Sequence, residues 1–274
     1  MSYNPDAFDA FEAVGWAEKE AHAYATLAGR VTSRLAEPLL DAVAAGPGTR
    51  LVDVATGPGY VAAAGAARGA EVVGVDLSEA MLEFACSRSP DVDFVRADAT
   101  ALPFDDASFN ACTAAFVLLH LGTPERAVSE AARVLDQGGA AAFTVWDVPA
   151  RGRWLGVLLD AVAEVGAAPP ADVPPGPPLF QFADDGAFCA LLEGARLVDV
   201  EVQTIDFSLG LESADELWEG LVEGTVRVRP LVSAQAEGTQ RAIRARFEEL
   251  LEEYRTGAGF EVPVAVKLAS GRKP

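Results

Sequence analysis

Short apolar runs alternate with helix-like stretches in the middle of the chain, between Thr49 and Trp146. This alternation is typical of repeated βαβ units, in which crossover helices join parallel strands. The pattern therefore predicts a doubly wound α/β core with a mostly parallel sheet. Its five strands are expected at residues 50–54, 71–75, 92–97, 111–119 and 140–146.

The segment between the fourth and fifth strands has the pattern of an amphipathic helix. Thr123 is placed to cap its first turn, and Pro124 suits the first helical position. Gly138 and Gly139 are expected to end it. The apolar stripe that should face the sheet consists of Ala127, Val128, Ala131 and Leu135.

The flanks of this core differ from it in pattern. Residues 1–47 have helical periodicity and precede the first strand, so an N-terminal helical lid is expected there. Residues 48–274 are expected to form the main domain, with elaborations near 149–188 and 209–256. The two strands that would complete a sheet of seven are expected at 196–207 and 260–270.

Two groups of apolar residues are expected to face inward from the flanking helices. The group near the N-terminus comprises Phe8, Phe11, Val31, Leu35 and Leu39. The group on the late helix comprises Ile243, Phe247, Leu250, Leu251 and Tyr254.

Composition and charge narrow the function classes. Half of the 274 residues are apolar, which is enough to bury the core of one large α/β domain. The chain has 41 acidic and 21 basic residues, and its net charge of −20 disfavours nucleic acid as a partner. The three cysteines form no C-x-x-C pair and the start MSYNPDAFDAF lacks a signal segment, so we expect a cytoplasmic protein without a metal site. No membrane span is expected, because no run of about 18 apolar residues occurs.

The first strand, RLVDV, leads directly into the glycine turn ATGPG. Backbone N–H groups exposed at such a turn bind nucleotide-like ligands. Gly57, Gly59 and Ala62 satisfy a relaxed dinucleotide pattern. However, Asp53 would repel a pyrophosphate, and Pro58 removes an N–H that could hold it. A ligand with positive charge fits better, and S-adenosylmethionine carries an ammonium and a sulfonium but no phosphate.

Three stretches, VDVATGPG, GVDLSEAML and ADATALPFDDASFN, follow one another between Thr49 and Asp147. They resemble the cofactor motifs of class I S-adenosylmethionine-dependent methyltransferases, particularly of the ubiquinone/menaquinone-biosynthesis-like branch. The resemblance implies a Rossmann-like fold, S-adenosylmethionine as cofactor and S-adenosylhomocysteine as product. Ala55 stands where the family's first motif has a glycine, which is a mild departure.

The resemblance also implies roles for individual residues. Asp76 would accept hydrogen bonds from both ribose hydroxyls, and Asp98 would accept one from the adenine amino group. Leu77 and Met81 would pack on the adenine, while Ala99 would offer its backbone N–H. The other residues expected to bind the cofactor are Tyr24, Asp53, Ala55, Thr56, Gly57, Gly59 and Phe116.

Each of the three acids also has a purely structural interpretation. Asp53 could stabilise the turn, Asp76 could start a helix, and Asp98 could be a solvated loop residue. All three nevertheless follow successive predicted strands, at the edge where ligands bind in such sheets. Their joint placement favours a cofactor site.

Methyl transfer needs alignment and desolvation more than covalent help, so few catalytic residues are expected. His120, after the fourth strand, is the candidate base, and its structural alternative is a helix-start histidine bonded to backbone. The adjoining AFVLLH lacks the Pro-Pro-aromatic motif that commonly accompanies methylation of exocyclic amines. The expected acceptor is therefore the carbon or oxygen of a small, partly apolar metabolite. Aromatic residues that could line its pocket, with core filling expected for most, are Trp154, Phe180, Phe182, Trp218 and Phe247.

Two other classes of function stay open at this stage. A protein of this fold could use the pocket for another reaction, such as a cyclisation, or for partner binding. A nicotinamide-dependent oxidoreductase is the third possibility, and Asp53 and Pro58 weaken it.

Overall fold

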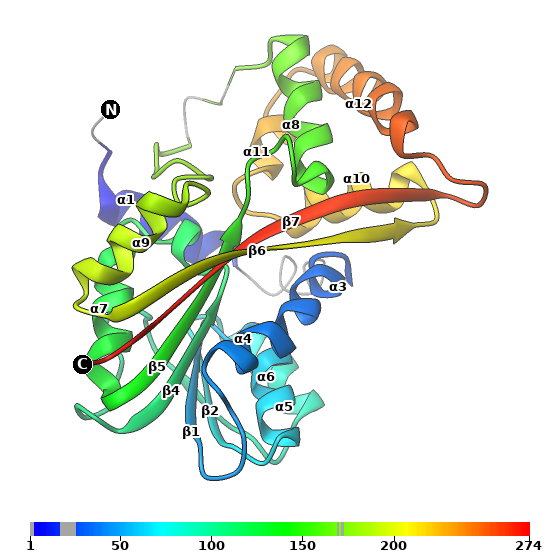
Figure 1. The fold of residues 1–274 in the computed structure, drawn as a ribbon. Coiled ribbons are helices and arrows are strands. Elements are labelled where there is room, and N and C mark those ends of the chain that lie inside the picture. The colour runs from blue at the N-terminus through cyan, green and yellow to red at the C-terminus, as the bar shows by residue number, and fades with distance from the viewer. Residues whose placement is uncertain (1–2, 17–25, 169, 171–172) are drawn as a thin grey trace. The chain divides into compact units, whose positions relative to one another are not determined.

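The computed structural model describes residues 3–16, 26–168, 170 and 173–274. Its sheet has the strand order β3-β2-β1-β4-β5-β7-β6 (Figure 1). The predicted seven-stranded, doubly wound α/β fold is therefore confirmed. The strands are β1 (Arg50–Val54), β2 (Glu71–Asp76), β3 (Asp93–Arg96), β4 (Phe109–Ala115), β5 (Leu135–Trp146), β6 (Val198–Leu211) and β7 (Phe260–Arg272).

Strand direction makes one edge of the sheet suitable for binding. β1 pairs in parallel with both β2 and β4, β2 with β3, and β4 with β5. Because the chain order reverses between β1 and β4, the carboxyl ends of these strands form the switch point where such sheets bind ligands. β7 runs the other way, since the N–H of Gly138 donates to Lys273 and the N–H of Asp147 donates to Ala265.

The chain forms two compact units. The sheet unit comprises Thr32–Trp146, Pro177–Thr204 and Lys267–Pro274, and the helical unit comprises Met1–Val31, Asp147–Gly176 and Ile205–Val266. Residues 32–47, expected with the N-terminal lid, thus group with the sheet. The role of residues 1–47 as a lid stays a prediction.

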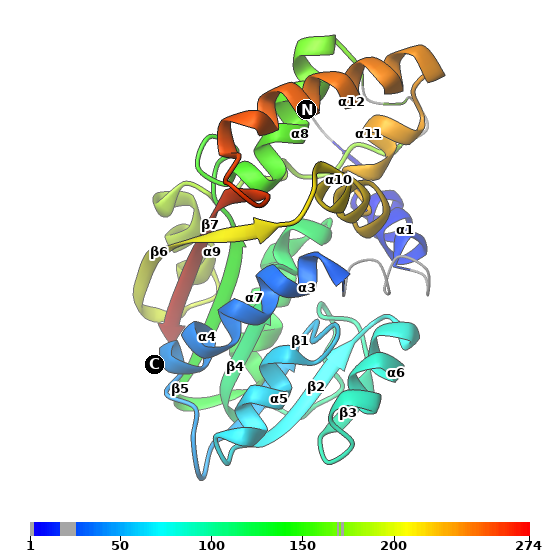
Figure 2. The ribbon, with the colours of Figure 1, turned by 90° about the vertical axis from the view of Figure 1, so that its right-hand side faces the viewer.

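In the sheet unit, helices cover both faces of the strands. α4 (Ala36–Ala42), α5 (Tyr60–Ala67) and α6 (Glu79–Arg88) lie on one face, and α4 and α5 lie side by side in both views (Figures 1 and 2). The other face carries α7 (Pro124–Val134) and α9 (Asp185–Gly194), which contact each other. Apolar side chains from strands and helices fill the core, among them Val52, Val128, Phe143 and Phe188.

In the helical unit, α8 (Arg153–Val165) packs along α12 (Glu237–Leu251). The predicted inward stripe of α12 is confirmed for Ile243, Phe247 and Leu251, which are fully buried. Leu250 and Tyr254 are only partly buried, and Tyr254 lies beyond the end of the helix. The remaining described helices of this unit are α1 (Pro5–Gly15), α3 (Ala28–Thr32, at the boundary), α10 (Ala214–Gly224) and α11 (Arg229–Ser233).

Helix length also bears on the membrane question. Among the described residues, none of the helices combines the length and the apolar character that crossing a bilayer requires.

The end of α7 is among the element boundaries that differ from those predicted. α7 ends at Val134, and Leu135 already belongs to β5, so the expected helix to Gly138 is wrong at its end. The Lys273 ammonium fits this early end, because it donates to the carbonyl of Arg133 in the last turn and to that of Leu135, the first residue after the helix. A cation thus takes the place of a glycine cap at this helix terminus.

The fourth strand is likewise shorter than expected, ending at Ala115 and not at Leu119. Phe116 has a φ of 57°, in the left-handed region, and a 3₁₀ turn over Leu118–His120 follows. Ala55, directly after β1, has a φ of 53°. Neighbouring strands therefore both end at a non-glycine residue in a conformation that favours glycine.

The Ala55 conformation generates a prediction on stability. Ala55→Gly should raise the free energy of unfolding by about 0.5–1 kcal/mol, because it removes a Cβ that opposes the left-handed backbone. Ala66→Gly, at an exposed position in α5, should lower it by about 0.5–1 kcal/mol through lost helix propensity. Urea unfolding of both variants measures the two changes, and a destabilised Ala55→Gly would contradict the backbone argument.

Candidate functional site at the carboxyl ends of the strands

The loop between β1 and α5 turns on left-handed residues. Gly57 and Gly59 have φ values of 52° and 77°. A Cβ on Gly59 would lie 3.0 Å from the Cβ of Ala85, so this glycine permits α6 to pack closely on the loop. A Cβ on Gly57 would have no atom within 4 Å, so the loop has open space at this residue.

Asp53 is buried beneath this loop and accepts two side-chain hydrogen bonds. Its side chain is 1% exposed; Oδ2 accepts a hydrogen bond from Thr56 Oγ1 (2.6 Å), and Oδ1 accepts one from Thr113 Oγ1 (2.8 Å). Burial raises the pKa of Asp53 to about 6, and the two hydroxyl bonds oppose that rise. The carboxyl group therefore joins β1, β4 and the loop. Its direct attraction to a cofactor stays a prediction.

Asp76, the last residue of β2, connects the first two motifs. Its Oδ2 accepts from the N–H of Gly57 (2.9 Å), and its Oδ1 accepts from the N–H of Ser78 (2.8 Å). Burial raises its pKa, while these backbone bonds and the charge of His120 lower it. The residue as a whole is partly exposed, and a carboxylate offers about four lone-pair positions, of which the two backbone N–H groups occupy two, so acceptor capacity is left for ribose hydroxyls.

Asp76 does start a helix, as its structural interpretation predicts, while its role toward ribose stays a prediction. Ser78 caps α6 by accepting from the N–H of Met81 (3.3 Å), and Asp76 fixes Ser78. One carboxylate thus starts a helix and holds the glycine loop. The contact between Asp76 and Gly57 was not predicted from the sequence. The sequence indicated it only by placing both residues at the carboxyl ends of successive strands.

The third motif follows β3. Asp98 accepts through Oδ1 from both the N–H (2.7 Å) and the hydroxyl (2.8 Å) of Thr100. The N–H of Ala97 donates to the carbonyl of Asp76 (3.0 Å), which joins this loop to the end of β2. Leu77 is 47% exposed, whereas Met81 and Ala99 are buried. An exposed leucine between two loops suits an apolar contact with a planar ring, and that role stays a prediction.

Phe116 and His120 follow β4. The Phe116 ring stacks on Trp146 with centroids 3.8 Å apart, so the carboxyl ends of β4 and β5 carry an aromatic pair. The backbone N–H of His120 donates to the carbonyl of Val117 (2.8 Å) in the 3₁₀ turn, and the role of its imidazole stays a prediction. Its charge lowers the pKa of Asp76.

The structure thus brings most of the sequence-predicted residues to one edge of the sheet. Thr56 and Gly57 belong to the first loop, which is bonded to Asp53 of β1 and to Asp76 of β2. Tyr24 lies outside the described residues. Sequence reasoning missed Thr113, although a hydroxyl in an otherwise apolar strand was the available signal.

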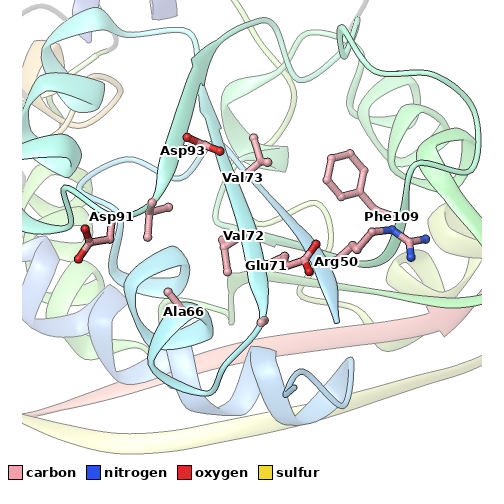
Figure 3. A pocket seen from close by; sticks show the side chains of 10 residues that line it. Arg50, Ala66, Glu71, Val72, Val73, Asp91, Asp93 and Phe109 are labelled. Carbon is pink, nitrogen blue, oxygen red and sulfur yellow. The ribbon is translucent and has the colours of Figure 1, made fainter. Parts of the chain in front are cut away.

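A cavity of about 390 Å³ lies elsewhere in the sheet unit (Figure 3). Arg50, Glu71, Asp93 and Phe109 line it, and each stands at the first position of its strand. The cavity is therefore at the amino ends of the strands, whereas Asp53 and Asp76 stand at or next to the carboxyl ends. It is not part of the candidate site.

Comparison with known proteins agrees with this geometry. Residues 52–143 match the family described as Methyltransferase domain. Demethylmenaquinone methyltransferase of Renibacterium salmoninarum is 44% identical over 108 residues, which are 39% of this chain and 46% of the relative. The match thus spans less than half of that relative's length.

Two solved structures share the fold at low sequence identity. A Haemonchus contortus phosphoethanolamine N-methyltransferase 2, in complex with phosphomonomethylethanolamine and S-adenosylhomocysteine, superposes with a TM-score of 0.54 at 18% identity, covering 88% of this chain and 52% of the other. The cyclase SpnF superposes with a TM-score of 0.51 at 20% identity, covering 88% and 81%. Residues 52–143 therefore resemble the methyltransferase-domain family, and the sheet that carries them has the fold of the class I S-adenosylmethionine-dependent methyltransferases.

Proposed function

We propose that this protein transfers a methyl group from S-adenosylmethionine to the carbon or oxygen of a small, partly apolar metabolite. The proposal rests on the two hydrogen bonds that the Asp76 carboxylate accepts, from the N–H groups of Gly57 and Ser78. It sets a carboxylate, on a partly exposed residue, beside an open glycine loop. A ribose needs such an acceptor, and the adjoining methionine part needs a close approach to backbone.

The residues present fit the cofactor in charge as well. Asp53 and Asp76 place two carboxyl groups around the loop, which suits a ligand bearing a sulfonium and an ammonium. A dinucleotide would bring a pyrophosphate to the same loop, where Asp53 would repel it and Pro58 offers no N–H to hold it. This contrast supports S-adenosylmethionine over a nicotinamide cofactor.

When bound, S-adenosylmethionine supplies a methyl group on a positively charged sulfur that is a good leaving group. The chain's task is then to hold and orient. Asp76 would hold the ribose, Leu77 and Met81 would pack on the adenine, and Asp98 and Ala99 would fix the edge of the base. His120 is our candidate for taking a proton from the acceptor.

The fold alone does not decide the chemistry, since the cyclase SpnF shares it. A cyclisation in this protein would form product without consuming S-adenosylmethionine. Stoichiometric appearance of S-adenosylhomocysteine with methylated product separates the two reactions. The demethylmenaquinone methyltransferases suggest apolar ring compounds as the first acceptors to assay.

Asp76→Asn should lower the affinity for S-adenosylhomocysteine by at least about tenfold, because two ribose hydroxyls lose an ionised acceptor. The variant should also lose the wild-type preference for S-adenosylhomocysteine over its 2′-deoxy analogue. Calorimetric titration measures both. Asp93→Asn, at the amino end of β3, is the control and should bind normally. An affinity within twofold of wild type would refute the ribose assignment.

Gly57→Val should abolish cofactor binding while the protein still folds, because the side chain would occupy the open space over the loop. Gly48→Val is the matched control, since Gly48 also has a positive φ of 84° and no atom within 4 Å of its Cβ. Both variants should lose similar stability in thermal melts. Equal binding by the two variants would mean that the loop only turns the chain.

His120→Gln tests the proposed base. The rate constant at saturation should fall by at least about a hundredfold, because glutamine cannot take a proton near neutral pH, while S-adenosylhomocysteine affinity and melting temperature stay unchanged. If affinity falls together with rate, the histidine supports the cofactor through its electrostatic link to Asp76 instead. A nearly unchanged rate would leave catalysis to alignment alone.

A further inference from the structure

The loop from residue 97 to residue 108 carries the proposed adenine-binding residues but contains no helix or strand. One isolated bridge, between Asp98 and Ala101, is its only ladder contact among the described residues. A loop of this length must be held in place by contacts with the rest of the protein if Asp98 and Ala99 are to hydrogen-bond the edge of the adenine. The start is fixed by the bond from Ala97 to Asp76, so the question is what fixes the rest.

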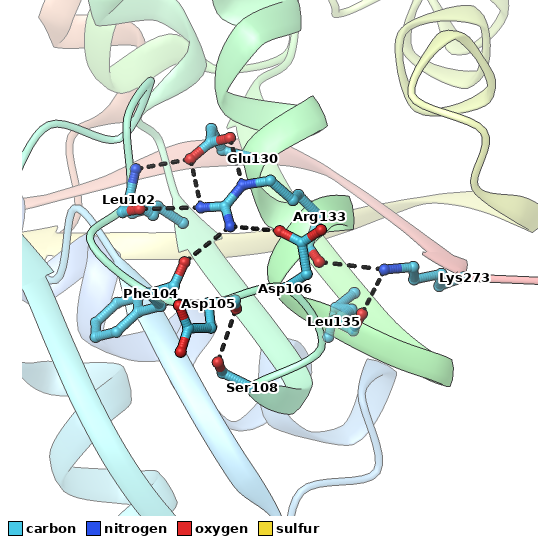
Figure 4. A network of polar contacts seen from close by, with 9 residues as sticks. All are labelled: Leu102, Phe104, Asp105, Asp106, Ser108, Glu130, Arg133, Leu135 and Lys273. Carbon is cyan, nitrogen blue, oxygen red and sulfur yellow. Dashed lines mark hydrogen bonds and ion pairs between the residues drawn. The ribbon is translucent and has the colours of Figure 1, made fainter.

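The guanidinium of Arg133, on α7, provides those contacts (Figure 4). Its Nη2 donates to the carbonyl of Leu102 (2.9 Å), and its Nη1 donates to the carbonyl of Phe104 (2.8 Å) and to Asp106 Oδ1 (2.9 Å). The carbonyl of Arg133 accepts in turn from the N–H of Ala107 (3.2 Å). One residue thus contacts the loop at four positions, beginning three residues after Ala99.

Glu130 completes the arrangement one turn earlier on α7. Its Oε2 accepts from the N–H of Leu102 (2.8 Å), whose carbonyl accepts from Arg133. The Glu130–Arg133 ion pair therefore binds both backbone polar groups of Leu102. Glu130 and Arg133 also hold each other bidentately, at 2.7 and 2.8 Å. Because guanidinium and carboxylate are both planar, their hydrogen bonds are directional, and the pair fixes where the loop backbone lies. We call the Glu130–Arg133 pair the Arg133 template.

Apolar contacts support the same loop independently. Leu102 is buried, and the Phe104 ring meets the Phe109 ring edge to face with centroids 4.9 Å apart. Loss of the Arg133 contacts should therefore leave the loop attached to the core while freeing its backbone path. A change in geometry, more than unfolding, is the expected consequence.

We propose that Arg133, paired with Glu130, is a positioning residue for adenine recognition, which sets the backbone path that presents Asp98 and Ala99 to the base. This inference rests on the proposed function. Arg133 need not touch the cofactor, since it acts through Leu102, Phe104 and Asp106.

The test compares two ligands that differ only at the base edge. S-inosyl-L-homocysteine carries a carbonyl oxygen where S-adenosyl-L-homocysteine has an amino group, and its ring N1 is protonated. It should bind wild type at least about tenfold more weakly, because Asp98 and the Ala99 N–H then face mismatched groups. Arg133→Met should reduce that preference to about threefold or less. Arg126→Met, an exposed position on the same helix, should leave it unchanged.

The outcomes separate the inference from the function on which it rests. If Arg133→Met keeps the wild-type preference within twofold, the inference is overturned, even where the melting temperature falls. If wild type binds neither ligand, the proposed function itself fails. Should Arg133→Met not fold, Glu130→Gln applies the same comparison, because the amide keeps the side chain's shape but has one acceptor oxygen, so it cannot accept at both positions as the carboxylate does. A reduced preference in that variant supports the inference, and an unchanged one overturns it.

Discussion

The hydrogen bond from the N–H of Gly57 to the carboxylate of Asp76 joins the ends of two neighbouring strands, and the candidate site depends on it. Without this bond, the loop after β1 and the start of α6 would be fixed separately. With it, a single side chain sets the distance between the backbone that approaches the ligand and the oxygens that would hold its ribose. The cost is a carboxylate taken partly from water, which is visible in its raised pKa.

Asp53 extends the same constraint into the core. Its ionised form is disfavoured by burial, so on its account the folded state becomes less stable as pH rises through about 6. Two threonine hydroxyls offset part of that penalty by donating to the carboxyl oxygens. A buried acid that only shaped a turn could be replaced by a neutral group. Retaining the charge beside a ligand loop is understandable if the ligand itself is positive.

Periodicity was sufficient to predict the sheet, because strands buried on both faces read as continuous apolar runs. It placed β1 at its observed bounds and β2 within one residue. It failed at the ends of β4 and α7, where Phe116 adopts a left-handed conformation and Lys273 caps a helix more than 130 residues away in sequence. Local pattern carries no information on such distant partners. The division into two compact units could not be predicted from local pattern either, because each unit consists of three segments that are separate in the sequence.

For the candidate site, the sequence was enough to predict the three acidic residues but not the residues that hydrogen-bond to them. The order of strands placed Asp53, Asp76 and Asp98 at one edge, yet the pairing of Asp53 with Thr113 follows from a register that only the folded sheet defines. The same holds for the Arg133 template, whose residues belong to a helix with no motif of its own. In a reaction that depends on alignment, these supporting contacts matter as much as the groups that face the ligand, since a small displacement of either changes the geometry at the reacting carbon.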